Sequence, residues 1–113
     1  MPVSKDLIAA SATPLILSIL AEGDSYGYAI IKRVRNLSDG KMEWTDGMLY
    51  PVLHRLASQG LVESYADTSE IGRERKYYSL KKEGTRALAE HRSQWMLVHN
   101  TLQRLWETKP CPT

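Results

Sequence analysis

The chain has 113 residues, of which 42% are hydrophobic and 25% charged, a profile typical of one globular domain with a modest core. The net charge of +2 excludes a uniformly basic surface, so any nucleic-acid-binding patch must be local. The single cysteine, Cys111, excludes a disulfide framework and a cysteine-ligated zinc finger, and no apolar run reaches the ~18 residues of a membrane span.

Helices are predicted through the first 40 residues. Residues 4–12 have a helical pattern with Ser4 as N-cap, and Pro14 is expected to interrupt it before a second helical segment runs from residue 13 to Glu22. After Gly23, Asp24 and Ser25 are expected to cap a helix over residues 26–37. Its apolar positions are Gly27, Ile30, Ile31, Val34 and Leu37.

The most informative stretch is residues 45–60. Leu49, Val52, Leu53 and Leu56 have the spacing of a helix with one buried face, which Thr45 would cap and Gly60 would end. The opposite face is short, polar and aromatic, and it includes Gly47, Tyr50 and His54. Such a face can enter a groove. Pro51 lies inside this helix and predicts a tightened first turn.

A β-hairpin follows, which we call the wing (residues 61–80). Residues 61–65 and 75–80 are typical of strands, and the connection between them is polar and turn-rich. The stretch 73–82 is locally basic in a nearly neutral chain, with only Glu74 opposing its cations. These are Arg73, Arg75, Lys76, Lys81 and Lys82.

One long helix is predicted from Lys82 to about Glu107. Its apolar positions follow a heptad seam that begins at Gly84, and a protruding apolar helix would be costly without a partner. We therefore expect a homodimer. The predicted interface consists of Leu88, His91, Trp95, Val98, Leu102 and Leu105.

Three helices followed by a basic hairpin predict a winged helix-turn-helix, a mainly α fold with a small β-hairpin (α+β). Residues 1–80 would form the DNA-binding domain, with the N-terminal helix contributing to the dimer, residues 81–107 the dimerisation helix, and residues 108–113 a disordered tail. The third helix would enter the major groove and the wing would lie along the backbone or the minor groove. The predicted DNA contacts are Thr45, Gly47, Tyr50, His54, Lys32, Arg73, Arg75 and Lys76.

Three motifs resemble the PadR family of bacterial transcriptional regulators. They are Gly47-Met48-Leu49-Tyr50-Pro51 with His54-Arg55-Leu56, Gly72-Arg73-Glu74-Arg75-Lys76-Tyr77-Tyr78, and Gly23-Asp24-Ser25-Tyr26-Gly27-Tyr28. The single C-terminal helix is similar to that of the short, multidrug-sensing members. The resemblance implies a homodimeric repressor that binds an operator and releases it on binding a small planar aromatic compound. A cytoplasmic location is expected from the single cysteine, which fits a reducing compartment. The implied ligand contacts are Leu7, Pro14, Leu15, Leu17, Trp95, Val98 and His99.

Two alternatives remain open from the sequence. Trp95 is either interface packing alone or the wall of a ligand site, and the winged helix could bind another protein without an operator of its own. We expect no enzyme, cofactor or metal site, because His54, His91 and His99 lack metal-ligand spacing and no catalytic constellation is present.

Overall fold

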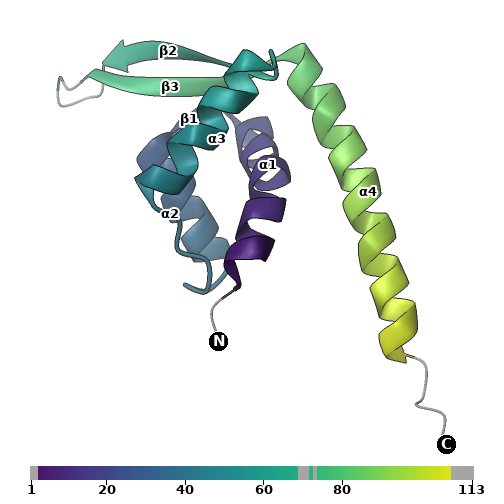
Figure 1. Cartoon of the computed structure of the whole chain (residues 1–113). Coiled ribbons are helices and arrows are strands. Elements are labelled where there is room, and N and C mark those ends of the chain that lie inside the picture. Colours follow the sequence, from purple (N-terminus) through teal and green to yellow (C-terminus); the bar gives the residue numbers. More distant parts are fainter. Residues whose placement is uncertain (1–2, 69–71, 73, 108–113) are drawn as a thin grey trace, which may run out of the picture.

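The computed structural model describes residues 3–68, 72 and 74–107, so the predicted tail lies outside it. The elements, in order, are α1 (Lys5–Glu22), β1 (Ser25–Tyr26), α2 (Gly27–Leu37), α3 (Asp46–Ser58), β2 (Val62–Thr68), β3 (Glu74–Leu80) and α4 (Lys82–Glu107). Three helices lie under one face of a small antiparallel sheet, and α4 extends away from them (Figure 1). The predicted α+β winged-helix architecture is confirmed.

Helix α1 is continuous through Pro14, and the predicted interruption there is wrong. Ser4 is the N-cap, and its side chain accepts a backbone N–H at 3.2 Å. Pro14 has no N–H to offer the carbonyl of Ala10, but Ala10 is exposed and its carbonyl can be hydrated. The helix continues because the residues after Pro14, including Ile16 and Leu20, are buried in the core.

The sheet has a third strand that the sequence did not reveal. Ser25 pairs with Tyr78 and Tyr26 with Tyr77, giving the order β1-β3-β2. Ser25 is therefore extended and paired with β3, so the prediction that it caps α2 is wrong. Helix α2 starts at Gly27 and its N-cap, Tyr26, makes no side-chain capping bond.

Helix α3 has both of its predicted ends. The Thr45 hydroxyl accepts the Met48 N–H at 3.2 Å. At the other end Gly60 has a φ of +75°, a left-handed conformation that glycine adopts without strain. The Leu61 N–H then donates to the Leu56 carbonyl at 3.0 Å, which closes the helix with a Schellman-type turn.

The core lies between α1, α2, α3 and the inner face of the sheet. Its fully buried side chains include Ile16, Leu17, Ile30, Leu49, Leu53, Leu56, Val62 and Tyr78. Trp44, in the connection before α3, is also buried. The apolar stripe of α2 ends at Val34, because Leu37 immediately precedes an exposed turn and is 58% exposed itself.

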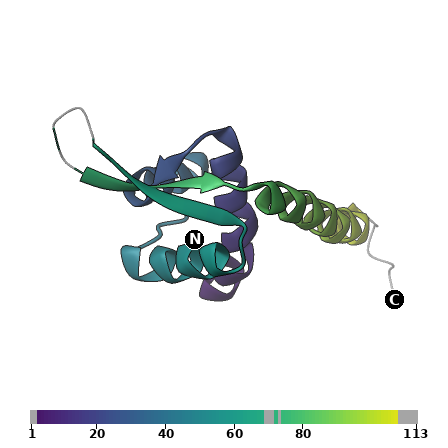
Figure 2. The same cartoon turned by 90° about the horizontal axis from the view of Figure 1, so that it is seen from above.

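Helix α4 makes the molecule elongated. Its 26 residues correspond to about 39 Å, and the radius of gyration is 16.8 Å, against roughly 13 Å for a compact chain of this length. Viewed from above, the wing and α4 extend in opposite directions from the helices (Figure 2). The wing, which is predicted to bind DNA, and α4, which is predicted to bind a second subunit, therefore lie at opposite ends of the molecule.

Candidate functional site

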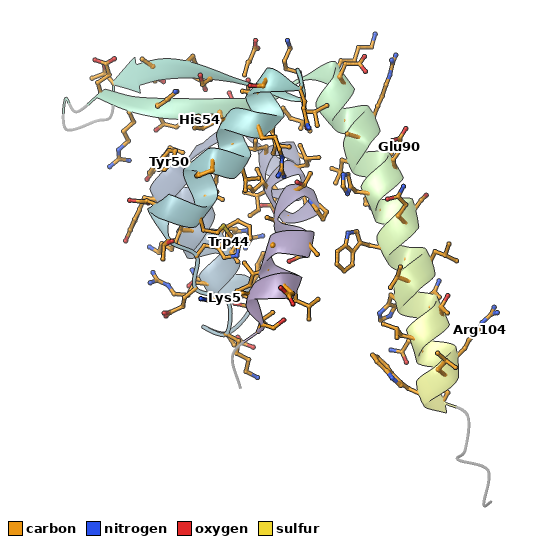
Figure 3. All side chains as sticks on the ribbon, in the orientation of Figure 1. Lys5, Trp44, Tyr50, His54, Glu90 and Arg104 are labelled. Atoms are coloured by element: carbon orange, nitrogen blue, oxygen red, sulfur yellow. The ribbon has the colours of Figure 1, made fainter. Side chains whose placement is uncertain are left out.

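One candidate surface consists of the exposed side of α3 together with the wing. Thr45, Gly47 and His54 are all exposed along α3. Figure 3 shows Tyr50 and His54 on α3 beneath the β2–β3 hairpin. Lys32 is exposed on α2. The capped, exposed first turn of α3 has the positive dipole end that attracts phosphate, although Asp46 in this turn offsets part of that charge.

Tyr50 is half-buried, although the helical pattern places it on the face opposite the buried one. Its ring and hydroxyl lie against Gly27, so a Cβ at position 27 would collide with them. Burial raises the pKa of the Tyr50 phenol, the Asp46 carboxylate raises it further, and the ammonium of Lys76 acts in the opposite direction. Tyr50 thus packs α3 against α2 beside the wing, and a direct DNA contact from it stays a prediction.

The two described wing cations point to opposite faces of the sheet. The Lys76 ammonium lies 5.8 Å from the ring centroid of Tyr78, whose side chain is in the core. The Arg75 guanidinium carbon lies 4.4 Å above the Tyr26 ring on the outer face. Lys76 is therefore on the side of α3, whereas Arg75 is not. Arg73 lies outside the described residues.

A second candidate site is an apolar cavity of about 330 Å³ between α1 and α4. Its lining consists of Val3, Leu7, Ser11, Pro14, Leu15, Ser18, Met42 and Trp95. The structure thus brings together four of the predicted ligand contacts, from Leu7 to Trp95. Four lining residues were not predicted from the sequence, although Ser11 and Ser18 share the helical spacing of Leu7 and Leu15. They are Val3, Ser11, Ser18 and Met42.

Three predicted ligand contacts do not line this cavity. Leu17 is fully buried in the core, so its assignment to the cavity is wrong; it lies about 200° around α1 from Leu15. Val98 lines a smaller adjacent hollow of about 190 Å³ with Gln94 and Trp95. His99 is exposed and lines neither hollow.

The predicted seam of α4 divides into two parts. Gly84 and Leu88 are buried within the chain's own core, so the assignment of Leu88 to a dimer interface is wrong. The reason is that Gly84 seats the start of α4 directly against the backbone of Leu61. His91 and Trp95 are half-buried. The exposed large apolar side chains of α4 are Met96, Leu97, Val98, Leu102, Leu105 and Trp106.

No group of three or more metal-ligating side chains occurs among residues 3–68, 72 and 74–107. In the same part of the chain, no helix is both long and apolar enough to cross a membrane.

Comparisons with known proteins agree on one family. Residues 16–90 match the family described as "Transcriptional regulator PadR-like family". A solved transcriptional regulator from Clostridium thermocellum is 32% identical, with a TM-score of 0.81, and the match covers 90% of this chain and 96% of that chain. A PadR family transcriptional regulator from Eggerthella lenta is 36% identical, with a TM-score of 0.74, over 92% of this chain and 88% of that chain.

A curated relative is longer. The transcriptional regulator YqjI of Escherichia coli (strain K12) is 33% identical over 89 residues, which are 79% of this chain but 41% of that protein. The matched family and these relatives are transcriptional regulators and not enzymes.

Proposed function

Because this chain belongs to the PadR-like family of transcriptional regulators, we propose that it is a homodimeric repressor that binds an operator in the bacterial cytoplasm. Residues 1–80 form the DNA-binding unit and residues 81–107 the dimerisation helix. The observation that carries the proposal is the position of Lys76, on the α3 side of the wing, with its ammonium 5.8 Å from the ring centroid of the buried Tyr78. A side chain there can contact a phosphate while His54 reaches the adjacent major groove.

Selection of binding sequences from a random duplex library tests this function. A dimer with one α3 per subunit should enrich a pseudo-palindrome whose half-sites are separated by about 10 base pairs or a multiple of that distance. A library that shows no enrichment, while the protein captures another protein through α3, would support a winged helix that recognises proteins instead.

The exposed apolar side chains of α4 support dimerisation. Val98, Leu102 and Leu105 are 52%, 38% and 65% exposed. Their spacing puts them on one face of α4, and an exposed apolar stripe of this kind is typical of a subunit interface. A second copy is the partner that a heptad seam fits.

Replacing both Val98 and Leu102 with aspartate is expected to give a monomer, since two carboxylates would lose their hydration in the interface. Sedimentation at micromolar concentration measures this. Asn100→Asp is the matched control: position 100 is exposed on the same helix, about 200° around it from each replaced residue. It should leave the dimer intact. A monomeric unmodified protein would contradict the proposed interface.

The cavity beside Trp95 supports a small aromatic effector. Its volume is near the lower end for small-molecule sites, and none of its lining side chains is charged. Neutral or weakly anionic planar compounds fit this chemistry better than strongly cationic dyes. A flat ring can stack on the indole of Trp95.

A structural route connects this cavity with α3. Pro14 lines the cavity, and its neighbour Thr13 accepts a hydrogen bond from the Arg55 guanidinium of α3 at 2.9 Å. A ligand that displaces α1 would therefore move a direct contact of the recognition helix. Ligand binding can then favour one separation of the two α3 helices in the dimer.

Trp95→Ala is expected to weaken binding of planar aromatic compounds about tenfold or more, because it removes the largest apolar wall of the cavity. Calorimetric titration with a panel of such compounds measures the loss. Trp106→Ala is the control, because Trp106 is 69% exposed and does not line the cavity. Equal affinities of the two variants would leave Trp95 as interface packing only.

A further inference from the structure

Three tyrosines cross the outer face of the sheet, one from each strand. Tyr65 of β2 stacks on Tyr77 of β3, with ring centroids 5.8 Å apart and an interplanar angle of 17°. Tyr77 in turn meets Tyr26 of β1 edge to face at 5.3 Å. These residues are register partners, Tyr65 with Tyr77 and Tyr77 with Tyr26. The aromatic row therefore connects both edges of the sheet.

A hydrogen bond to a carboxylate joins the β2 side of this row to the chain just before β1. The Tyr65 hydroxyl donates to the Asp24 carboxylate at 2.6 Å, and Asp24 directly precedes β1 in the connection between α1 and α2. This bond raises the pKa of Tyr65 to about 12. A tyrosine phenol is protonated at neutral pH even without this shift, so Tyr65 is a hydrogen-bond donor there. A side chain of β2 thus reaches across β3 to the far edge of the sheet.

The wing needs such a connection because β1 is short. Strand β3 pairs with β2 through seven residue pairs, but with β1 through only two. Strands β2 and β3 are therefore joined to each other along their whole length, while few backbone bonds join them to β1. The buried side chains of Val62 and Tyr78 also hold the hairpin on the core. The contact of Tyr65 with Asp24 adds a further attachment on the outer face of the sheet.

We propose that Tyr65 is a positioning residue for DNA binding, which straps the wing to the start of α2 through Asp24 and so sets where the wing cations lie relative to α3. This proposal rests on the proposed DNA-binding function. The strap leaves Lys76 on the α3 side of the sheet and acts without touching DNA itself. Its loss should weaken contacts to phosphates on every sequence, because the wing makes backbone contacts.

Two variants break the strap from opposite ends. Tyr65→Phe removes only the hydroxyl and keeps the stack on Tyr77. Asp24→Ala removes the acceptor, and Asp24→Asn restores an acceptor oxygen with the same change in net charge, so these two form a charge-matched pair. Tyr28→Phe is the control for loss of a phenol, since Tyr28 is 62% exposed on α2 and outside the aromatic row.

Two measurements are made on the full chain. Hydrogen exchange of the DNA-free protein should be about fivefold faster in residues 24–27 and 77–78, which form the short β1–β3 pairing, for Tyr65→Phe and Asp24→Ala. It should stay close to that of the unmodified protein for Asp24→Asn and Tyr28→Phe. Titration with a duplex should give a Kd about fivefold higher for Tyr65→Phe, together with a salt slope smaller by about one. A merely structural role would lower Tm and leave the salt slope unchanged.

The outcomes separate the strap from the DNA-binding function. Unchanged exchange in Tyr65→Phe, or an unchanged Kd and salt slope while the unmodified protein binds DNA, would overturn the strap. Equal behaviour of Asp24→Asn and Asp24→Ala would also overturn it. A third outcome is that the unmodified protein binds no duplex, while Tyr65→Phe shows faster hydrogen exchange. In that case the attachment of the wing through Asp24 is supported, but its role in DNA binding is rejected together with the proposed function.

Discussion

Replacing Gly84 with alanine is expected to lower the free energy of unfolding by about 3 kcal/mol, the upper part of the range for overpacking a close contact. A Cβ at this position would collide with the backbone carbonyl of Leu61 and would lie 2.6 Å from the Leu80 side chain. Backbone atoms cannot rotate away as a flexible side chain can, so α4 would have to shift. Urea denaturation followed by circular dichroism measures the loss.

Gly47→Ala is the matched control for this prediction. Both glycines lie within helices, but the nearest atom to a Cβ at position 47 is the Thr45 hydroxyl oxygen at 3.9 Å. Without a collision, alanine should leave stability unchanged or raise it by up to ~1 kcal/mol through its higher helix propensity. Equal losses of stability in both variants would show that the close contact between Gly84 and the Leu61 backbone does not hold α4 in its position.

The same contact is expected to affect the dimer. Because Gly84 sets the angle at which α4 leaves the sheet, a shifted helix would present its exposed apolar side chains in a different direction. Gly84→Ala should therefore weaken dimerisation even under conditions where most chains remain folded. Sedimentation of the variant at several concentrations measures this effect.

The second large effect concerns DNA. His54→Ala should raise the Kd for the selected operator about tenfold or more and leave binding to unrelated duplex nearly unchanged, since a base contact contributes only where the right base is present. Lys76→Ala should weaken binding to both duplexes by a similar factor and reduce the salt slope by about one. Parallel titrations of the two variants against both duplexes make the comparison.

His54 is a cleaner probe than Tyr50 for this purpose. Tyr50 packs against Gly27 and is half-buried, so Tyr50→Ala would also loosen α3. Glu63→Gln serves as a surface control, because Glu63 is exposed on β2 outside the proposed contacts. Equal losses on both duplexes for His54→Ala would remove its role in recognising bases.

Features fixed by nearby residues could be predicted from the sequence. Helix α3 begins where the Thr45 hydroxyl accepts the N–H of Met48, three residues further along the chain. It ends at Gly60, which has a left-handed conformation. The length of α4 also follows from an uninterrupted local pattern. In each case the decisive interaction lies within a few residues along the chain, where spacing and capping chemistry are informative.

Features that depend on distant partners could not be predicted. Ser25 has the chemistry of a helix cap, but it pairs with Tyr78, 53 positions further along. Pro14 ordinarily ends a helix, yet core packing on both sides of it keeps α1 continuous. The periodicity of α4 likewise gives no indication of which seam residues face the chain's own core. Leu88 packs into the core because Gly84 allows the start of α4 to lie against the backbone of Leu61. Leu61 is 23 positions away from Gly84, so this contact has no local sequence pattern.

One titration tests the central claim, that α3 and the wing bind DNA at a specific site. The unmodified dimer is titrated with its selected operator and with a scrambled duplex of equal length at salt concentrations from about 50 to 200 mM. We predict that the operator binds at least about 10³-fold more tightly than the scrambled duplex and that both affinities fall steeply with salt. Equal affinities for the two duplexes, or no binding at the lowest salt, would contradict the proposed function.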